Sequence, residues 1–373
     1  MRNILITGGA GFIGSNFILY FLKKYPNYRL INVDLLTYAG DLQNLSGVEN
    51  YPNYIFEKGD ICDKDFIKDI FAHYAIDSVI HFAAESHVDN SIKNPSAFVE
   101  TNVNGTFNLL HNAYLSWFDA PSCPKAHKEH CIFHHISTDE VFGSLGESGY
   151  FSESTPYAPN SPYSASKASS DMFVRSYHHT YGLKTFITNC SNNYGPKQHD
   201  EKLIPTIIRK ALSGEKIPIY GDGQNIRDWL YVEDHCRAID SVFHSSYFGE
   251  SFNVGGNCER TNIQIAKQIC ALLDSLKPKS SGESYQNQIT FVQDRAGHDR
   301  RYAIDSGKII RLFGFQPSDF YNNLSKTIEF YIHKYTLASL LRGGGYSQFF
   351  LFCPFYCFYL LLYLTKKRSL DES

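Results

Sequence analysis

The stretch Ile4-Leu5-Ile6-Thr7-Gly8-Gly9-Ala10-Gly11-Phe12-Ile13-Gly14 is the strongest indication of the fold. Its aliphatic and β-branched beginning predicts a short strand, its glycines predict a tight turn, and the apolar periodicity of residues 12–22 predicts a helix. Gly8, Gly11 and Gly14 are spaced three apart and leave bare backbone at the N-terminus of that helix. Such a turn is typical of sites where a diphosphate binds the first N–H groups of a helix.

Asp34 supports a dinucleotide site. It stands twenty residues after Gly14, at the end of the next predicted strand, where a carboxylate can accept hydrogen bonds from ribose hydroxyls. Its negative charge would repel a 2′-phosphate, which favours NAD over NADP. The alternative is a structural turn followed by a surface aspartate, and the spacing favours the cofactor site.

Strands and helices alternate through the first half of the chain. Further strands are predicted at 29–33, 54–57, 78–82, 131–137 and 185–188, with helices at 64–74, 96–117 and 164–181. The alternation indicates βαβ units, and therefore an α/β fold of the Rossmann type with a doubly wound parallel sheet. Ligands of such sheets bind at the carboxyl ends of the strands.

The alternation loosens after Tyr194-Gly195-Pro196. Helices at 204–213, 233–244 and 261–276, a strand at 217–220 and an exposed loop at 277–288 indicate a smaller α+β lobe. We therefore expect a dinucleotide-binding domain at 1–195, with a return near 225–245, and a mostly substrate-binding lobe at 196–340. Residues 343–373 form an atypical hydrophobic tail.

Composition and charge exclude several classes of protein. The 373 residues are 43% hydrophobic and 20% charged, which excludes wholesale disorder, a collagen-like fibre and a polytopic membrane protein. A formal net charge of −3 gives no basic excess to bind nucleic acid. The nine cysteines contain no Cys-x-x-Cys pair, so neither a metal site nor a disulfide scaffold is expected. The N-terminal apolar stretch is too short for a signal peptide, so we expect a cytoplasmic protein with reduced thiols.

The tail raises a separate question. Residues 349–364 are almost wholly aromatic and aliphatic, and Lys366-Lys367-Arg368 follows them. Sixteen residues span about 24 Å as a helix, less than the ~30 Å of a hydrocarbon core, and Pro354 interrupts the run. A membrane anchor is therefore not favoured over its alternatives, a hydrophobic end packed on a dimer or an altered reading frame.

Tyr163 and Lys167 stand four residues apart at the start of a predicted helix, so both project from one face. A neighbouring ammonium favours phenolate, so we expect Lys167 to lower the pKa of Tyr163 and to make it a proton acceptor near neutral pH. Solvated helix faces carry the same spacing, and the dinucleotide signature upstream favours the catalytic interpretation.

Thr138, Asp139 and Glu140 follow another predicted strand, so two adjacent carboxyl groups stand at the edge of the sheet where the cofactor is expected. They could be solvated groups or an N-cap. Beside a site of hydride transfer, the pair suggests one acid and one base.

The chain resembles the extended short-chain dehydrogenase/reductase family and, within it, the sugar-nucleotide 4,6-dehydratases, from Met1 to about Tyr335. The Thr-Asp-Glu triplet distinguishes these dehydratases from related epimerases, which lack the acid pair. Besides the glycine turn, the triplet and the Tyr163–Lys167 pair, the resemblance rests on Asp60-Ile61-Cys62-Asp63, Phe82-Ala83-Ala84-Glu85-Ser86-His87-Val88-Asp89, Asn189-Cys190-Ser191-Asn192-Asn193-Tyr194-Gly195-Pro196, Ile226-Arg227-Asp228-Trp229-Leu230-Tyr231-Val232-Glu233-Asp234-His235 and Gly297-His298-Asp299-Arg300-Arg301-Tyr302-Ala303-Ile304-Asp305.

The resemblance implies a lyase that converts dTDP-glucose to its 4-keto-6-deoxy product and water, in deoxysugar nucleotide biosynthesis, with tightly held NAD regenerated in each turnover. Tyr163, assisted by Lys167, would take the proton of the O4 hydroxyl, and Thr138 would hydrogen-bond that oxygen. Glu140 would remove the C5 proton, and Asp139 would protonate the departing C6 hydroxyl.

The resemblance also implies the binding residues and a partner. Helices 96–117 and 164–181 would form the four-helix interface of a homodimer. The cofactor would contact Gly8, Gly11, Phe12, Ile13, Gly14, Asp34, Leu35, Leu36, Thr37, Asp60, Ile61, Phe82, Ala83, Ala84, Ser86, Thr101, Tyr163, Lys167 and Asn193. The nucleotide diphosphate-sugar would contact Ser86, Thr138, Asn192, Lys202, Leu203, Pro218, Ile219, Tyr220, Arg227, Asn262, Asp294, Arg295, Ala296, Gly297 and His298.

Other functions stay open at this point. A UDP-glucose 4,6-dehydratase would use the same mechanism on another base. An NAD-dependent 4-epimerase or decarboxylase would share the fold, Tyr163 and Lys167, but would leave Asp139 and Glu140 without a role. A non-enzymatic NAD-binding scaffold would leave all of these side chains without a role.

Overall fold

The computed structural model describes residues 2–294 and 299–342. Residues 1–328 form one compact unit, and a second unit begins at Glu329. The first unit contains all of the sheets, and the last helix, α11 (Phe320–Arg342), begins in it.

A parallel sheet of seven strands forms the centre of this unit, in the order β12-β8-β7-β4-β1-β2-β3. The strands are β1 (Arg2–Thr7), β2 (Tyr28–Asp34), β3 (Tyr54–Lys58), β4 (Ser78–His81), β7 (Ile132–Thr138), β8 (Thr185–Cys190) and β12 (Ser251–Val254). From β1 the chain winds toward β3 on one side and then from β4 toward β12 on the other. The predicted doubly wound Rossmann-type sheet is therefore confirmed, and its winding reverses between β1 and β4.

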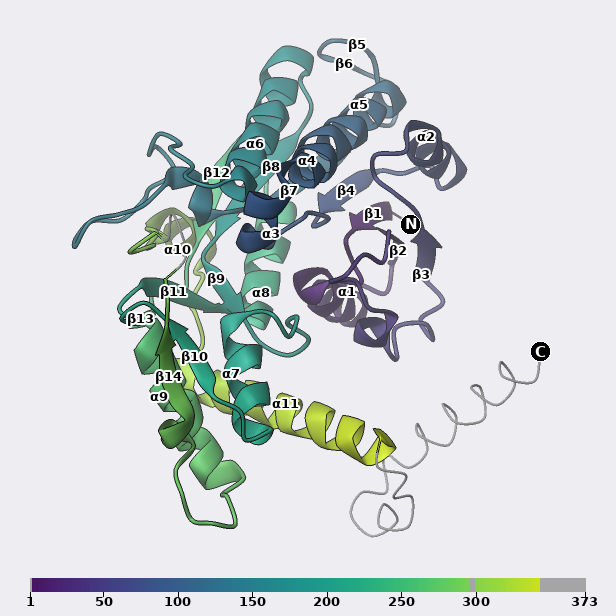
Figure 1. Ribbon diagram of the computed structural model, residues 1–373. Helices are drawn as coiled ribbons and strands as arrows, with labels where there is room; N and C mark the ends of the chain where they lie inside the picture. Colours follow the sequence, from purple (N-terminus) through teal and green to yellow (C-terminus); the bar gives the residue numbers. More distant parts are fainter. Residues whose placement is uncertain (1, 295–298, 343–373) are drawn as a thin grey trace. The chain divides into compact units, whose positions relative to one another are not determined.

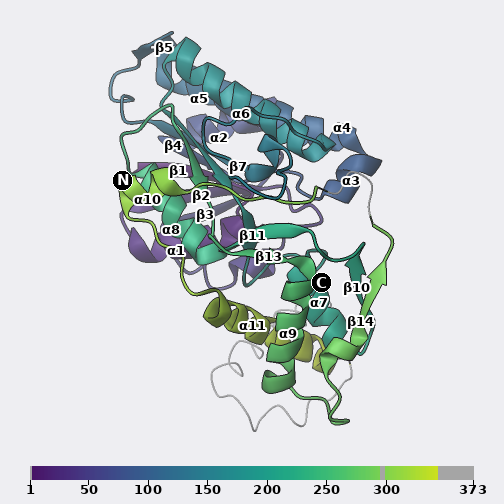
Figure 2. The same cartoon turned by 90° about the vertical axis from the view of Figure 1, so that its left-hand side faces the viewer.

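Helices cover both faces of the sheet, which explains why its strands are apolar on both sides. Within β1, Ile4 and Ile6 pack in one hydrophobic cluster and Leu5 packs in the other, because successive side chains of a strand point to opposite faces. Figures 1 and 2 show the two layers. One layer holds α1 (Phe12–Lys24), α8 (Val232–Phe243) and α10 (Gly307–Phe313), and the other holds α2 (Lys64–His73), α5 (Thr106–Trp117) and α6 (Pro162–Tyr181).

The ends of α6 are explained by its sequence. Ser161 and Ser164 form a capping box, Pro162 occupies the first turn, and Gly182 ends the helix in the left-handed conformation with φ +77°. Tyr163 therefore lies in the first turn, at the edge of the sheet where the strands end.

The predicted helix at 96–117 is interrupted. It consists of α4 (Pro95–Phe98), a π-helical segment (Val99–Gly105) and α5. Asn102 of the π segment exchanges two hydrogen bonds with the backbone of Glu85, at 2.8 and 3.0 Å, and donates to Ser166 Oγ at 2.8 Å. The segment thereby connects the loop after β4 to α6, in keeping with the frequent occurrence of π segments near functional sites.

The later part of the unit contains smaller sheets and two helices that pack together, α7 (Leu203–Leu212) and α9 (Asn262–Leu276). Strand β10 (Ile217–Tyr220) pairs with β14 (Ile289–Val292), and β11 (Ile226–Tyr231) lies between β9 (Asn192–Tyr194) and β13 (Glu259–Thr261). The remaining elements are α3 (Val88–Lys93) and the pair β5 (Phe118–Ala120) and β6 (Cys123–Pro124). The sequence analysis did not predict β11, β12, β14 or α10, and the expected loop at 277–288 ends in a 3₁₀ turn at Tyr285–Gln288.

The domain boundary at residue 195 stays a prediction. Helix α8 and strand β12, which come after that boundary in sequence, belong to the layers of the large sheet. The tail at 343–373 lies outside the described residues, so its anchor, packed-end and reading-frame interpretations remain predictions. No helix in the described part of the chain has the length and apolar character to cross a membrane. The cysteines in that part carry free thiols.

Substitution of Gly14 by alanine tests the packing of the first turn. A Cβ at Gly14 would lie 2.4 Å from the carbonyl oxygen of Gly8 and 2.8 Å from the Cα of Gly9, so the turn must shift. We expect Gly14→Ala to destabilise the protein by about 1–3 kcal/mol in chemical denaturation. Gly146→Ala is the matched control, because an added Cβ there meets no described atom within 4 Å. Equal stability of the two variants would contradict the packing argument.

Candidate active site

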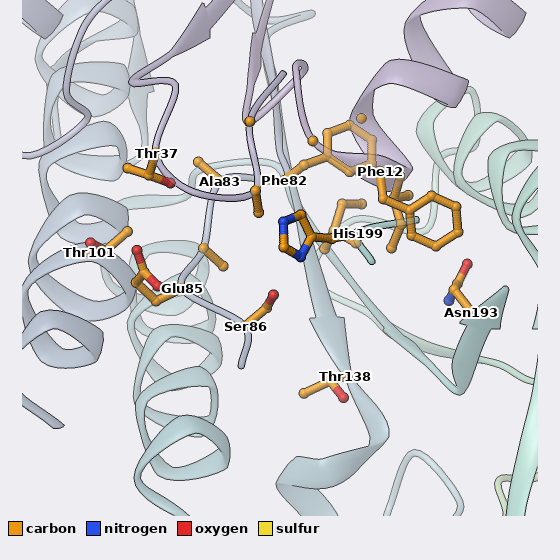
Figure 3. A pocket seen from close by; sticks show the side chains of 18 of the residues that line it. Phe12, Thr37, Phe82, Ala83, Glu85, Ser86, Thr101, Thr138, Asn193 and His199 are labelled. Carbon is orange, nitrogen blue, oxygen red and sulfur yellow. The ribbon is translucent and has the colours of Figure 1, made fainter. Parts of the chain in front are cut away.

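A pocket lies at the carboxyl ends of the central strands, next to the reversal between β1 and β4, where doubly wound sheets bind ligands. The glycine turn, the ends of β2, β4, β7 and β8, and the first turns of α6 all contribute to its wall. Figure 3 shows side chains from these segments around one hollow, among them Phe12, Thr37, Phe82, Ser86 and Thr138.

The glycine turn brings backbone directly to the pocket. Gly8 has φ +72°, and a Cβ on it would lie 2.6 Å from both the N and the Cα of Ala83, so only glycine fits without a shift. Gly11 is the N-cap of α1, but no side chain caps this helix and its first turn holds no acidic residue. The first N–H groups of α1 therefore face the pocket without an anionic partner from their own turn, an arrangement suited to a diphosphate.

Asp34 lies beside this turn at the end of β2. Its Oδ2 accepts a hydrogen bond from the backbone of Ala10 and its Oδ1 accepts one from Leu36, each at 2.8 Å. Burial raises the pKa of Asp34, and the two backbone bonds oppose that rise. Each carboxylate oxygen keeps a second lone pair, so Asp34 can also accept from the hydroxyls of a ribose.

The predicted catalytic residues, Thr138, Asp139, Glu140, Tyr163 and Lys167, all line this pocket. Strand β7 ends at Thr138, and the chain turns at once into a 3₁₀ helix at Asp139–Phe142 for which Thr138 is the N-cap. The backbone N–H of Glu140 donates to Thr138 Oγ1 at 3.3 Å. The N-cap interpretation of this segment thus applies to Thr138, while the two acids lie in the turn after it.

Asp139 is buried, with 1% of its surface exposed. Its Oδ1 accepts from Thr138 Oγ1 at 3.4 Å, whereas its Oδ2 has no hydrogen-bond partner among the described residues. Burial raises the pKa of Asp139 well above its ordinary value, and Glu140 and Asp228 raise it further against the opposing charge of Arg227. The raised pKa favours the protonated form of Asp139, which can donate a hydrogen bond at the pocket that it lines.

Tyr163 differs from the sequence-based expectation. Its pKa in the chain alone lies well above the ordinary value, because burial and the charges of Glu140 and Cys190 raise it more than a hydrogen bond with Thr138 lowers it. Lys167 instead donates through Nζ to the carbonyl oxygen of Ile136 at 2.8 Å and lies 3.2 Å from His135 Nε2. The expected lowering of the tyrosine pKa is therefore wrong for the chain by itself, because burial outweighs the opposing influences, while a contribution of Lys167 stays a prediction.

Of the predicted cofactor residues, the pocket excludes Leu36. The backbone of Leu36 serves Asp34, and its side chain packs against the hydrophobic cluster under α1. All the other predicted cofactor residues line the pocket: Gly8, Gly11, Phe12, Ile13, Gly14, Asp34, Leu35, Thr37, Asp60, Ile61, Phe82, Ala83, Ala84, Ser86, Thr101, Tyr163, Lys167 and Asn193.

The predicted substrate residues divide into three groups. Ser86, Thr138, Asn192 and Lys202 line the same pocket, where Lys202 Nζ donates to the carbonyl oxygen of Ser86 at 3.1 Å. Arg295, Ala296, Gly297 and His298 lie outside the described residues. Leu203, Pro218, Ile219, Tyr220, Arg227, Asn262 and Asp294 belong to the later lobe and do not line the pocket.

Arg227 is buried and held by the protein itself. Its guanidinium donates to the carbonyl oxygens of Ile226 at 2.7 Å and Asp299 at 3.0 Å and lies 4.4 Å above the ring of Tyr302. The guanidinium of Arg227, which the resemblance assigned to the sugar nucleotide, thus already bonds two carbonyl groups.

The sequence analysis missed several residues of the pocket. His199 points into the hollow in Figure 3, and its ring meets that of Tyr38 edge to face at 5.5 Å. Because ligands of parallel sheets bind at the carboxyl ends of the strands, the missed residues next to β4 and β7 could have been predicted. No motif identifies the 198–202 loop. The missed residues are Val33, Ala39, Gly40, Gly59, Glu85, Ile136, Ser137, Cys190, Ser191, Gln198, His199 and Glu201.

Comparison with known proteins identifies the family of the chain. The family model described as GDP-mannose 4,6 dehydratase matches residues 5–327. The dTDP-glucose 4,6-dehydratase of Neisseria meningitidis serogroup B is 51% identical, over 93% of this chain and 98% of its own. The Escherichia coli K12 protein named dTDP-glucose 4,6-dehydratase 1 is 49% identical, over 92% of this chain and 97% of its own.

Solved structures of dehydratases and epimerases also resemble this chain. The crystal structure of dTDP-glucose 4,6-dehydratase from Bacillus anthracis in complex with NAD is 44% identical, with a TM-score of 0.78 over 89% of this chain and 97% of that one. UDP-glucose 4-epimerase from Thermotoga maritima reaches the same TM-score at 27% identity, over 90% of this chain and 100% of that one. The fold is thus shared with epimerases, whereas the higher identity lies with the dehydratases. The chain belongs to the dTDP-glucose 4,6-dehydratase family of extended short-chain dehydrogenases/reductases.

Proposed function

We infer that the protein is an NAD-dependent hydro-lyase, which converts dTDP-glucose to dTDP-4-keto-6-deoxy-glucose and water. The observation that carries this function is the pair Asp139 and Glu140 beside Tyr163: one acid is buried with a raised pKa, and the other is partly exposed in the same pocket. Water loss needs both a proton donor and a proton acceptor, and this pair supplies them.

The pocket fits NAD. The uncapped N-terminus of α1 suits the diphosphate, and Asp34 suits the adenosine ribose. NAD bound there would supply a hydride acceptor for sugar C4 and a hydride donor for C6. The chain itself must then orient the sugar and move protons at O4, C5 and the C6 hydroxyl.

Tyr163 is a neutral phenol in the chain by itself, and in this proposal its phenolate form is the base for the O4 hydroxyl. Thr138 lies within hydrogen-bonding reach of Tyr163, and its hydrogen bond favours the phenolate. Lys167, one turn further along α6, contributes positive charge on the same face of the helix. Transfer of the O4 proton to the Tyr163 oxygen, together with loss of the C4 hydride to the nicotinamide, would leave the sugar as a 4-ketone, which acidifies its C5 hydrogen.

Asp139 and Glu140 act on the neighbouring carbons. Glu140 takes the C5 proton, and the proton of Asp139 passes to the C6 hydroxyl, so that the C6–O bond breaks and water leaves. Glu140 returns its proton to C5 when C6 is reduced. The substrate loses one water in total, and Glu140 recovers its starting state. Tyr163 has then gained the O4 proton and Asp139 has lost one, so the cycle closes when Tyr163 releases a proton and Asp139 takes one up.

The remaining binding residues are proposals of the same kind. The pocket residues with a predicted cofactor role would hold NAD, and Ser86, Asn192 and Lys202 would meet the sugar nucleotide where the later lobe reaches the pocket. An epimerase would give Asp139 and Glu140 no task, so the acid pair favours the dehydratase.

We also propose a homodimer. Helices α5 and α6 pack against each other, as Figures 1 and 2 show. Together with the π-helical segment they expose Val99, Phe107, Leu115, Met172 and Phe173, with 38–54% of each residue's surface accessible. Two copies of this apolar surface would cover each other in a four-helix contact. A cytoplasmic location, expected from the reduced thiols, likewise remains a prediction.

Incubation of the purified protein with dTDP-glucose tests the function. We expect the product to have lost the mass of one water, because both acid groups are in place, and mass spectrometry detects this loss. UDP-glucose in parallel tests the base: water loss with UDP-glucose alone would keep the mechanism and change the substrate. A folded, NAD-containing protein that removes water from neither would contradict the proposal.

Asp139→Asn tests the acid. We expect the rate of water loss to fall by about 10²-fold or more, because the asparagine amide cannot protonate the leaving hydroxyl. Oxidation at C4 should persist, seen as the absorbance of reduced nicotinamide. Since the pKa of Asp139 is raised, its deprotonation should contribute to the fall of the wild-type rate as pH increases, and this contribution should be absent from the variant. Asp222→Asn, at an exposed carboxylate outside the pocket lining, is the control; equal effects of both variants would rule out the role of Asp139.

Leu115→Glu tests the dimer. A charge on the exposed face of α5 should separate the two copies, because it would be buried without a partner, and light scattering should report a change from dimer to monomer. Leu312→Glu, on the exposed side of α10, should leave the mass unchanged. A wild-type monomer, or a dimer unaffected by Leu115→Glu, would contradict this interface.

A further inference from the structure

A group of buried polar side chains lies behind Lys167, on the side away from the pocket. Lys167, His135 and Asp171 are 4%, 0% and 0% exposed. His135 Nε2 lies 3.2 Å from Lys167 Nζ and 3.3 Å from Asp171 Oδ1. The proposed mechanism assigns no task to His135 or Asp171.

Helix α6 explains how a carboxylate comes to lie here. Tyr163, Lys167 and Asp171 are four residues apart in turn, so they share one face of the helix. That face begins in the pocket with Tyr163 and continues into the protein interior against β7 and β8. A buried ammonium is unfavourable without compensation, and an aspartate one turn further along provides it.

Asp171 is held as a carboxylate by three donors on one oxygen. Its Oδ2 accepts from Ser137 Oγ at 2.8 Å, Tyr157 Oη at 2.9 Å and Asn189 Nδ2 at 3.3 Å. These donors come from β7, from the loop before α6 and from β8. Hydrogen bonds to the charged form favour ionisation, so the three donors keep Asp171 charged in the protein interior.

The other groups around Lys167 do not supply an equivalent charge. Tyr163 lies on the same helix, His135 on β7, His81 on β4 and Cys190 on β8. Burial lowers the pKa values of both histidines below their ordinary value and raises those of Tyr163 and Cys190, so all four are neutral near pH 7.

From this arrangement we propose that Asp171 is a positioning residue for the reaction: it provides the counter-charge that holds the Lys167 side chain as an ammonium behind Tyr163. The inference rests on the proposed function, because only a reaction that uses Tyr163 as a base needs that ammonium. His135 fills the space between the two charges and fixes their separation.

The charges of Lys167 and Asp171 determine in which direction the pKa of Lys167 changes when Asp171 is replaced. Burial lowers the pKa of Lys167 to about 8, with Asp171 as the main opposing influence, and burial raises that of Asp171 to about 6, with Lys167 opposing. Loss of the Asp171 charge would lower the pKa of Lys167 further. The ammonium, and the activity that needs it, would then be lost at a lower pH than in the wild type.

Asp171→Asn measures this effect. We expect the alkaline limb of the kcat profile to move down by about one pH unit or more, which is about a tenfold loss of kcat above the new limb. The KM for dTDP-glucose and the NAD content should change less than about twofold, since Asp171 does not line the pocket. Asp171→Glu, which keeps the charge, should restore the wild-type limb.

Tyr157→Phe is the matched control. It removes one of the three donors to the same oxygen and leaves both charges, so it reports any purely structural effect of disturbing the group. Thermal denaturation of each variant accompanies the kinetics. An Asp171→Asn profile that coincides with the wild type, or one that shifts no further than Tyr157→Phe, would overturn the proposal.

Two further measurements keep the outcome decisive. If Asp171→Asn does not fold, NMR titration of the Lys167 side chain in the wild type tests whether Lys167 is an ammonium, as the proposal requires. Lys167→Arg assigns the signal. A signal that titrates above pH 7 supports a charged lysine, and one that titrates below pH 7 overturns the proposal. Water loss by the wild type is measured first, so that a failure of the proposed function is recognised before any Asp171 variant is compared.

Discussion

The close approach of the Gly8 backbone to Ala83 is the contact that positions the site. A Cβ at Gly8 would lie 2.6 Å from backbone atoms of Ala83, and the residue adopts φ +72°. This contact joins the turn after β1 to the loop after β4, the two strands between which the winding of the sheet reverses. It brings the uncapped start of α1 to the carboxyl edge of the sheet, and the pocket forms where the two loops meet.

Burial then sets the chemistry of the side chains around that edge. Desolvation is the largest influence on the pKa values of Asp139, Tyr163, Lys167 and Asp171. Two adjacent acids come to differ because β7 ends in a 3₁₀ turn, which turns Asp139 inward and leaves Glu140 partly exposed. The same interior that stabilises the fold therefore gives two adjacent carboxyl groups different surroundings, and it requires a counter-charge wherever an ion remains buried.

The path of the chain joins the two halves of the molecule at this pocket. Helix α8 and strand β12 return to the large sheet after the chain has left it, whereas β9 continues directly from β8 into the small sheet with β11. Residues 198–202 lie between these parts. Of these, Gln198, His199, Glu201 and Lys202 line the pocket, and Lys202 connects to the loop after β4 through its bond to Ser86. A substrate that contacts the later lobe is thereby placed against a cofactor on the sheet.

Local signals in the chain were enough to predict the sheet, the dinucleotide site and the acid pair, because each depends on hydrophobic periodicity, glycine spacing or a short motif. They did not reveal β11, β12 or the 198–202 loop, whose places depend on pairing with strands far away in sequence. They also gave the wrong direction for the pKa of Tyr163, since spacing along a helix reveals a neighbour but not the depth of burial. Only the tertiary structure showed which groups are desolvated, because burial and long-range contacts arise only when distant segments come together. It also showed that Arg227 already bonds backbone carbonyl groups and that Asp171 lies behind Lys167.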